Sequence, residues 1–219
     1  MQRSARTRPL TEDGQLVETP HGPARVFSHP VREAVGGLVL GHGAGGGVGA
    51  RDIVAVRDAA LEARIAVALV EQPYRVAGRR SPAPARQLDA AWTAVLGHLR
   101  DGPLGDLPVV TGGRSSGARV ACRTADATGA AGVLCLAFPL RPPQRRSATE
   151  PPPSRLDELE AVQIPVLVIQ GVSDRFGMPP SGEGRTVVQV KGDHSLAADR
   201  TAIATAARDW LAELLSSRR

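Results

Sequence analysis

A serine stands where an expected strand turns directly into an expected helix. Residues 113–117 read G-R-S-S-G, follow the apolar run 107–111 and precede the run 118–122. A G-x-S-x-G pattern in this context is typical of a nucleophile elbow, in which Ser115 is exposed at the edge of a sheet and the flanking glycines leave room for the neighbouring strand and helix. In a chain with 24 glycines the pattern can also be an ordinary strand-to-helix turn. The distinction depends on whether partners for the serine occur in the right places.

A serine hydroxyl needs a general base within hydrogen-bond reach, and the base needs an orienting partner. Of the five histidines, only His194 lies in a loop directly after the last expected strand, 186–190. Asp174 follows the expected strand 165–169, so its side chain is expected at the same edge of the sheet. These positions predict a catalytic triad of Ser115, Asp174 and His194.

Each partner of the serine also has a plainer interpretation. Asp193, adjacent to His194, is a second candidate for the orienting acid, although neighbouring side chains seldom point at each other. Asp174 belongs to a residue type that often forms turns, and a histidine beside the last helix is often a surface residue. The agreement of three independent placements favours the triad.

The glycine-rich stretch 42–47, H-G-A-G-G-G, follows the expected strand 37–41 and suits an oxyanion hole. Such a hole needs two backbone donors. We expect them to be the N–H of Ser116, at the start of a helix, and the N–H of Ala44. A phosphate-binding glycine loop is the competing interpretation, but the stretch fits its common patterns less well. His42 is expected to hold the loop by hydrogen bonds rather than to act as a base.

The pocket around the serine is expected between the loops 74–83 and 140–153. Five residues are expected to bind the substrate, the two glycines also being alternative oxyanion donors: Gly43, Gly45, Tyr74, Arg114 and Leu140. Arg114 either pairs with a strand-end acid such as Glu71 or faces the pocket. The arginines of the two loops either attract an anionic substrate or are solvated surface residues.

These side chains must be positioned by alternating strands and helices. Apolar strands are expected at 24–28, 37–41, 65–70, 107–111, 132–138, 165–169 and 186–190, and helices at 52–61, 84–100, 155–161 and 198–215, with another directly after the elbow. Unbroken apolar strands that alternate with helices predict an α/β fold, with a mostly parallel central sheet and helices on both faces. The site falls at the carboxyl ends of the strands, where such sheets bind ligands. Residues 1–15 are expected to form a flexible lead, and residues 16–219 a single domain.

Composition restricts the function further. The 219 residues carry a net charge of +5, but all except one of the 27 basic residues are arginines, scattered among acids. Aromatic residues make up 3% of the chain, too few for the stacking that single-stranded nucleic acids require. Nucleic acid is therefore not an expected partner. The expected partner is a small acyl substrate, and the protein is expected to be a monomer or a homodimer.

Cys122 and Cys135 are expected to be buried thiols, since no C-x-x-C pattern occurs. Neither a metal nor an organic cofactor is implied. The first residues lack the apolar region of a secretory signal, and no apolar run approaches the length of a membrane span. We therefore expect a cytoplasmic protein that does not associate with membranes.

Five motifs give the chain a resemblance to a known superfamily. They are residues 42–45, H-G-A-G; 112–119, G-G-R-S-S-G-A-R; 138–143, F-P-L-R-P-P; 170–177, Q-G-V-S-D-R-F-G; and 192–195, G-D-H-S. The chain resembles the α/β-hydrolase superfamily and, within it, the dienelactone-hydrolase-like group. Within that group, it is similar to a small branch that contains testis-expressed hydrolase-like proteins and a non-catalytic subunit of a histone acetyltransferase complex.

The resemblance implies the α/β-hydrolase fold, without a large lid, and a serine hydrolase that cleaves an ester, thioester or related acyl bond. Dienelactone hydrolases use a cysteine nucleophile, so their substrate does not carry over to Ser115. The branch usually has a second glycine where Ala118 stands. Its non-catalytic member implies the alternative of a catalytically silent binding or scaffold module. An acyltransferase would need an acceptor other than water, and no residue identifies one.

Overall fold

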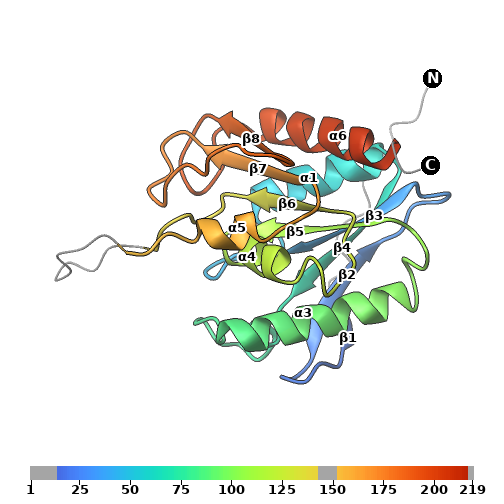
Figure 1. The fold of residues 1–219 in the computed structure, drawn as a ribbon. Coiled ribbons are helices and arrows are strands. Elements are labelled where there is room, and N and C mark those ends of the chain that lie inside the picture. Colours follow the sequence, from blue (N-terminus) through green and yellow to red (C-terminus); the bar gives the residue numbers. More distant parts are fainter. Residues whose placement is uncertain (1–13, 143–151, 217–219) are drawn as a thin grey trace.

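The computed structural model describes residues 14–142 and 152–216, and its strands form one eight-stranded sheet (Figure 1). The strands are β1 (Gln15–Val17), β2 (Ala24–His29), β3 (Gly36–Gly41), β4 (Ile65–Glu71), β5 (Val109–Arg114), β6 (Gly132–Leu136), β7 (Val166–Gly171) and β8 (Arg185–Val190). Their order across the sheet is β1-β2-β4-β3-β5-β6-β7-β8. Strand β2 is antiparallel to β1 and β4, and the other pairs are parallel. The carboxyl ends of β3 to β8 therefore meet at one edge.

Helices cover both faces of this sheet (Figure 1). Helices α1 (Arg51–Glu62) and α6 (Arg200–Ser216) pack against each other on one face. Helices α3 (Ala85–Arg100), α4 (Ser116–Arg123) and α5 (Leu156–Glu160) cover the other face. The short helix α2 (Pro73–Val76) follows β4.

Successive residues of the central strand β3 are buried on opposite faces of the sheet. Leu38 and Leu40 belong to the core beneath α1 and α6, whereas Val39 belongs to the core that contains Trp92 and Leu96 of α3. An unbroken apolar strand is the expected pattern for a parallel sheet that is covered on both sides. The expected fold class is confirmed.

Several local predictions differ from the structure, among them the strand expected at 132–138, since β6 ends at Leu136. Gln15, expected at the end of a flexible lead, is the first residue of β1 and pairs with Val26 of β2, whereas residues 1–13 lie outside the described residues. The segment after β4, expected as a loop, contains α2, which Pro73 begins at a position where a helix does not need its N–H. The strand expected at 107–111 runs three residues further, to Arg114, and so leads directly to Ser115.

Candidate active site

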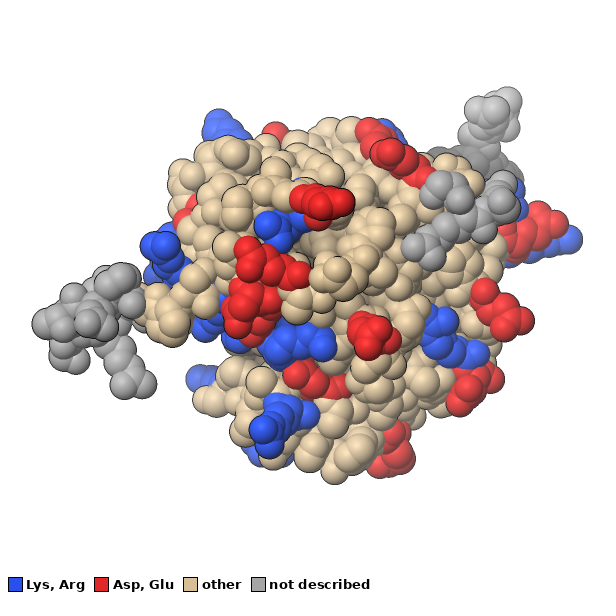
Figure 2. Space-filling model, viewed as in Figure 1, with Lys and Arg blue, Asp and Glu red and all other residues tan. Residues whose placement is uncertain are grey.

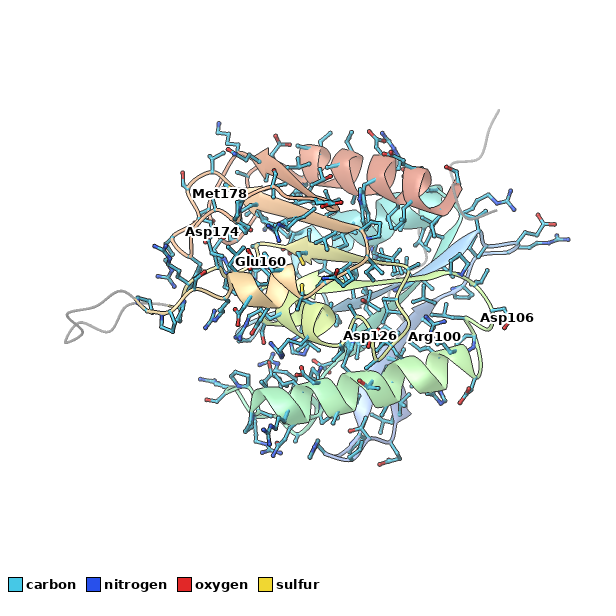
Figure 3. The ribbon with its side chains drawn as sticks, in the orientation of Figure 1. Arg100, Asp106, Asp126, Glu160, Asp174 and Met178 are labelled. Atoms are coloured by element: carbon cyan, nitrogen blue, oxygen red, sulfur yellow. The ribbon has the colours of Figure 1, made fainter. Side chains whose placement is uncertain are left out.

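The structure brings Ser115, Asp174 and His194 into one continuous chain of hydrogen bonds. Ser115 lies between β5 and α4, Asp174 follows β7, and His194 follows β8. The Ser115 Oγ is 3.0 Å from Nε2 of His194, and the Asp174 Oδ2 is 2.7 Å from Nδ1 of the same ring. Figure 3 shows Asp174 at one end of the sheet and Asp106, in the turn before β5, at the other. The three side chains thus meet at the carboxyl ends of the strands.

The turn at Ser115 has the strained backbone of a nucleophile elbow. Its φ of 52° lies in a region that residues other than glycine seldom adopt. A Cβ added at Gly113 or at Gly117 would lie 2.5 or 2.6 Å from the carbonyl oxygen of Gly41 in β3, so both positions require glycine. Helix α4 begins at Ser116, and the positive end of its dipole points toward the serine.

The Asp174 carboxylate is fully buried and accepts hydrogen bonds at both oxygens. Besides His194, the Nε2 of Gln170 donates to Oδ2 at 2.9 Å, and the backbone N–H of Phe176 donates to Oδ1 at 2.9 Å. These donors fix the carboxylate in place beside the imidazole of His194. The alternative acid, Asp193, is exposed, and the hydroxyl and N–H of Ser195 both donate to its carboxylate. These two hydrogen bonds lower the pKa of Asp193.

The glycine-rich loop is held from below by His42, as expected. The His42 Nδ1 is 2.8 Å from the Gly43 oxygen, and its Nε2 accepts from the backbone N–H of Gln72 at 3.1 Å, so the proton of the neutral ring lies on Nδ1. Burial lowers the pKa of His42. Tyr74 is 3% exposed, and its hydroxyl donates to the Ala44 oxygen at 3.3 Å. The structure therefore places Tyr74 beneath the loop, where it supports Ala44 rather than facing an open pocket.

Of the two alternatives for Arg114, pairing with a strand-end acid such as Glu71 does not occur. Glu71 ends β4, and its carboxylate is 3.7 Å from Arg25 of β2, its cross-strand neighbour. The Arg114 Nε is instead 2.9 Å from Oδ2 of Asp52, and its Nη2 donates to the backbone oxygen of His194 at 2.9 Å. The order of the strands explains the difference, because β3 separates β4 from β5 and Asp52 lies in the helix that follows β3.

A family model for the alpha/beta hydrolase domain matches residues 34–216. The chain belongs to the α/β-hydrolase family. A comparison with curated proteins gave no match.

Three solved structures illustrate which folds are similar to that of the chain. Est1E from Butyrivibrio proteoclasticus is 13% identical, with 94% of this chain and 100% of that chain covered and a TM-score of 0.74. Dienelactone hydrolase from Anabaena variabilis is 15% identical, with 93% and 96% covered and a TM-score of 0.69. An α/β serine hydrolase without lid from Xanthomonas campestris is 20% identical, with 90% and 94% covered and a TM-score of 0.65. At these identities the likeness concerns the fold alone.

In this α/β-hydrolase the imidazole of His194 packs against Phe176, a residue that the sequence analysis did not propose for the site. The ring of Phe176 lies 4.3 Å from that of His194, centroid to centroid, and the guanidinium of Arg175 lies 4.9 Å from the Phe176 centroid. Leu140, which follows β6, is buried and lies near Gly177, which belongs to the same loop as Phe176. A Cβ added at Gly45 would meet no atom within 4 Å, so this part of the glycine loop is open.

Two residues of the site could have been found from their sequence context. Gln170 is a polar residue directly after the apolar run 165–169, and a buried amide in that position needs partners. Phe176 is one of only six aromatic residues and follows the candidate acid by two positions.

Within residues 14–142 and 152–216, no three His, Cys, Asp or Glu side chains are grouped so as to hold an ion. Cys122 and Cys135 are free and buried, with 3.6 Å between their Sγ atoms. No described helix is long and apolar enough to cross a membrane. On the face in Figure 2, basic and acidic side chains are interleaved.

Proposed function

We propose that the protein is a serine hydrolase that cleaves an ester, thioester or related acyl bond of a small substrate. The observation that carries this proposal is the unbroken hydrogen-bond chain from Ser115 through His194 to the buried Asp174. Such a chain supplies what a serine nucleophile needs, namely a base within reach and an acid that orients the base.

The reaction would proceed in two halves. His194 Nε2 takes the proton of Ser115 Oγ as that oxygen attacks the substrate carbonyl, and the Nδ1–H of His194 donates to Asp174 throughout. The tetrahedral intermediate collapses when His194 returns the proton to the leaving alcohol or thiol. Water, deprotonated by His194, then attacks the acyl-enzyme, and the proton passes back to Ser115 Oγ as the carboxylic acid leaves.

The N–H groups of Ser116 and Ala44 are proposed to hold the oxyanion. Ser116 is the first residue of α4, where N–H groups have no acceptor inside the helix. Ala44 follows Gly43, whose Cα would carry a Cβ only 3.5 Å from the Cβ of Ser115, so the glycine loop passes directly beside the nucleophile. Both donors would then be close to the oxygen on which charge develops.

Several narrower statements remain predictions. They are the place of the chain in the branch of testis-expressed hydrolase-like proteins, the cytoplasmic location, the state as monomer or homodimer, and the direct contact of Gly43, Gly45 and Leu140 with substrate. The same holds for the preference for anionic substrates, and Arg145 and Arg146, two of the arginines considered for it, lie outside the described residues.

Labelling with a fluorophosphonate probe tests the proposed function. The wild-type protein is expected to be labelled, and Ser115→Ala is expected to abolish labelling and to lower kcat for p-nitrophenyl esters by at least about 10³-fold. His194→Ala is expected to label far more slowly. Ser216→Ala, at the exposed end of α6, is the matched control and should retain the wild-type rate. A folded wild-type protein that takes up no label would instead support the scaffold alternative.

A further inference from the structure

Arg114 joins three elements around the nucleophile. It is the last residue of β5, directly before Ser115, and its side chain is 17% exposed. Its Nε is 2.9 Å from Asp52 in the first turn of α1, and its Nη2 donates to the backbone oxygen of His194. Its Nη1 would lie 3.1 Å from a Cβ at Gly43, in the glycine loop. The guanidinium thus lies against the glycine loop, α1 and the histidine loop.

Asp52 is the anchor of this arrangement. Its carboxylate is 1% exposed, and burial raises the pKa of Asp52, although the nearby charge of Arg114 opposes the shift. A desolvated carboxylate of this kind needs a cation beside it. The contact between Nε and Oδ2 is an ion pair without hydrogen-bond geometry, so Asp52 holds the charge of the planar guanidinium in place and the hydrogen bond from Nη2 to the His194 oxygen sets its direction.

The hydrogen bond from Arg114 goes to the backbone of His194, the candidate base. The carboxylate of Asp174 and the ring of Phe176 orient the imidazole of His194, but both contact only its side chain. The hydrogen bond from Arg114 holds the carbonyl of the same residue. Since Arg114 directly precedes Ser115, its side chain links the chain next to the nucleophile with the backbone of the base.

We propose that the Arg114–Asp52 pair is a positioning device that holds the His194 backbone so that Nε2 stays within reach of Ser115 Oγ. The proposal rests on the proposed function. It differs from the expectation that Arg114 binds substrate, because two of the guanidinium nitrogens already contact protein groups and the third lies against Gly43. Loss of the Arg114 contacts with Asp52 and with the His194 oxygen should therefore slow the chemical step and leave substrate binding largely intact.

The experiment measures kcat and KM for p-nitrophenyl acetate, the rate of fluorophosphonate labelling and the melting temperature. Arg114→Met removes both contacts. Arg123→Met is the matched control, because Arg123 is 19% exposed and its ion pairs go to Asp89 of α3 and Glu158 of α5 rather than to the histidine loop. Both variants are expected to lower the melting temperature.

Only Arg114→Met is expected to lower kcat, by about 10- to 100-fold with KM within about twofold of wild type, because small displacements of a base cost that much. Arg114→Lys keeps the charge beside Asp52, and so the fold, but it lacks the rigid planar fork that contacts Asp52 and the His194 oxygen through separate nitrogens. It is expected to label at least about fivefold more slowly than wild type.

Three results would overturn the inference. One is a wild-type labelling rate in Arg114→Lys. The second is a rise in KM with kcat unchanged in Arg114→Met, which would assign Arg114 to substrate binding. The third is an equal fall of kcat in Arg114→Met and Arg123→Met. A wild-type protein that is not labelled at Ser115 overturns the proposed function as well, so the two failures are distinguishable.

Discussion

The amide of Gln170 is a single buried group that controls the position of the candidate acid. Its Nε2 is within hydrogen-bond distance of the backbone oxygens of Phe138 (3.1 Å) and Gly177 (2.9 Å) and of Oδ2 of Asp174 (2.9 Å). All three partners are acceptors, which assigns the NH2 group to this side of the amide. Because Gln170 is fully buried, water cannot take over these bonds when the amide is removed.

Replacing Gln170 by leucine is therefore expected to affect stability and activity together. The free energy of unfolding should fall by about 1–3 kcal/mol, since buried acceptors lose their donor. The value of kcat should fall about tenfold as Asp174 becomes less well fixed. Urea unfolding and hydrolysis of p-nitrophenyl acetate measure the two effects.

Gln163→Leu is the control for this substitution. Gln163 is exposed, and its amide donates to the Glu160 oxygen on the surface, so the change should stay within about 0.5 kcal/mol of wild type with kcat unchanged. Equal effects of the two substitutions would show that Gln170 has no special relation to the acid.

Among the elements, helix α4 and strand β3 touch at the backbone where the elbow forms. A Cβ at Gly117 would be 2.6 Å from the Gly41 oxygen and 2.9 Å from the His42 oxygen, both of which are backbone atoms. Neither can move away as a flexible side chain would. Close contact of α4 with β3 therefore places the glycine-rich loop beside Ser115, the candidate nucleophile.

Gly117→Ala is expected to lower the free energy of unfolding by about 1–3 kcal/mol, because overpacking forces the backbone apart, and to reduce kcat. Gly97→Ala is expected to have the opposite sign. Gly97 is exposed within α3, where a Cβ meets nothing within 4 Å, so alanine should stabilise the helix by about 0.5–1 kcal/mol. Thermal or urea unfolding of both variants decides the matter; destabilisation of similar size in both would contradict the close-contact argument.

The elements differ in how far the sequence could predict them. Long apolar runs such as 65–70 and 132–138 predicted strands β4 and β6, because a strand that is buried on both faces has an uninterrupted apolar pattern. Strand β1 has only three residues, two of them exposed, and such a short stretch shows no period. Its pairing with β2 depends on a neighbour that the residues of β1 do not specify.

At the scale of the whole molecule, strand order decides which side chains meet. The sequence could place Ser115, Asp174 and His194 at one sheet edge, because each follows a strand. It could not choose the partner of Arg114, since the choice between Glu71, at the end of β4, and Asp52, in the helix after β3, depends on the order of the strands in the sheet. The supporting contacts of the site therefore needed coordinates, whereas the placement of its three candidate residues at one edge did not.

The protein as a whole is expected to lose stability as the pH falls below about 6.5, because burial lowers the pKa of His42 in the folded state. Between the lowered pKa of folded His42 and about pH 6.5, the imidazole of His42 is protonated in the unfolded chain but not in the folded protein. The free energy of unfolding therefore decreases with falling pH, by no more than about 1.4 kcal/mol per pH unit for one group. His42→Gln removes this titration, and its slope in urea unfolding between about pH 6.5 and 5 should be shallower than that of wild type. His29, whose pKa is also lowered by burial, remains in both proteins and accounts for part of the residual slope. Identical slopes would mean that His42 is protonated in the folded state, and the hydrogen bond that it accepts from Gln72 could not then hold the glycine loop.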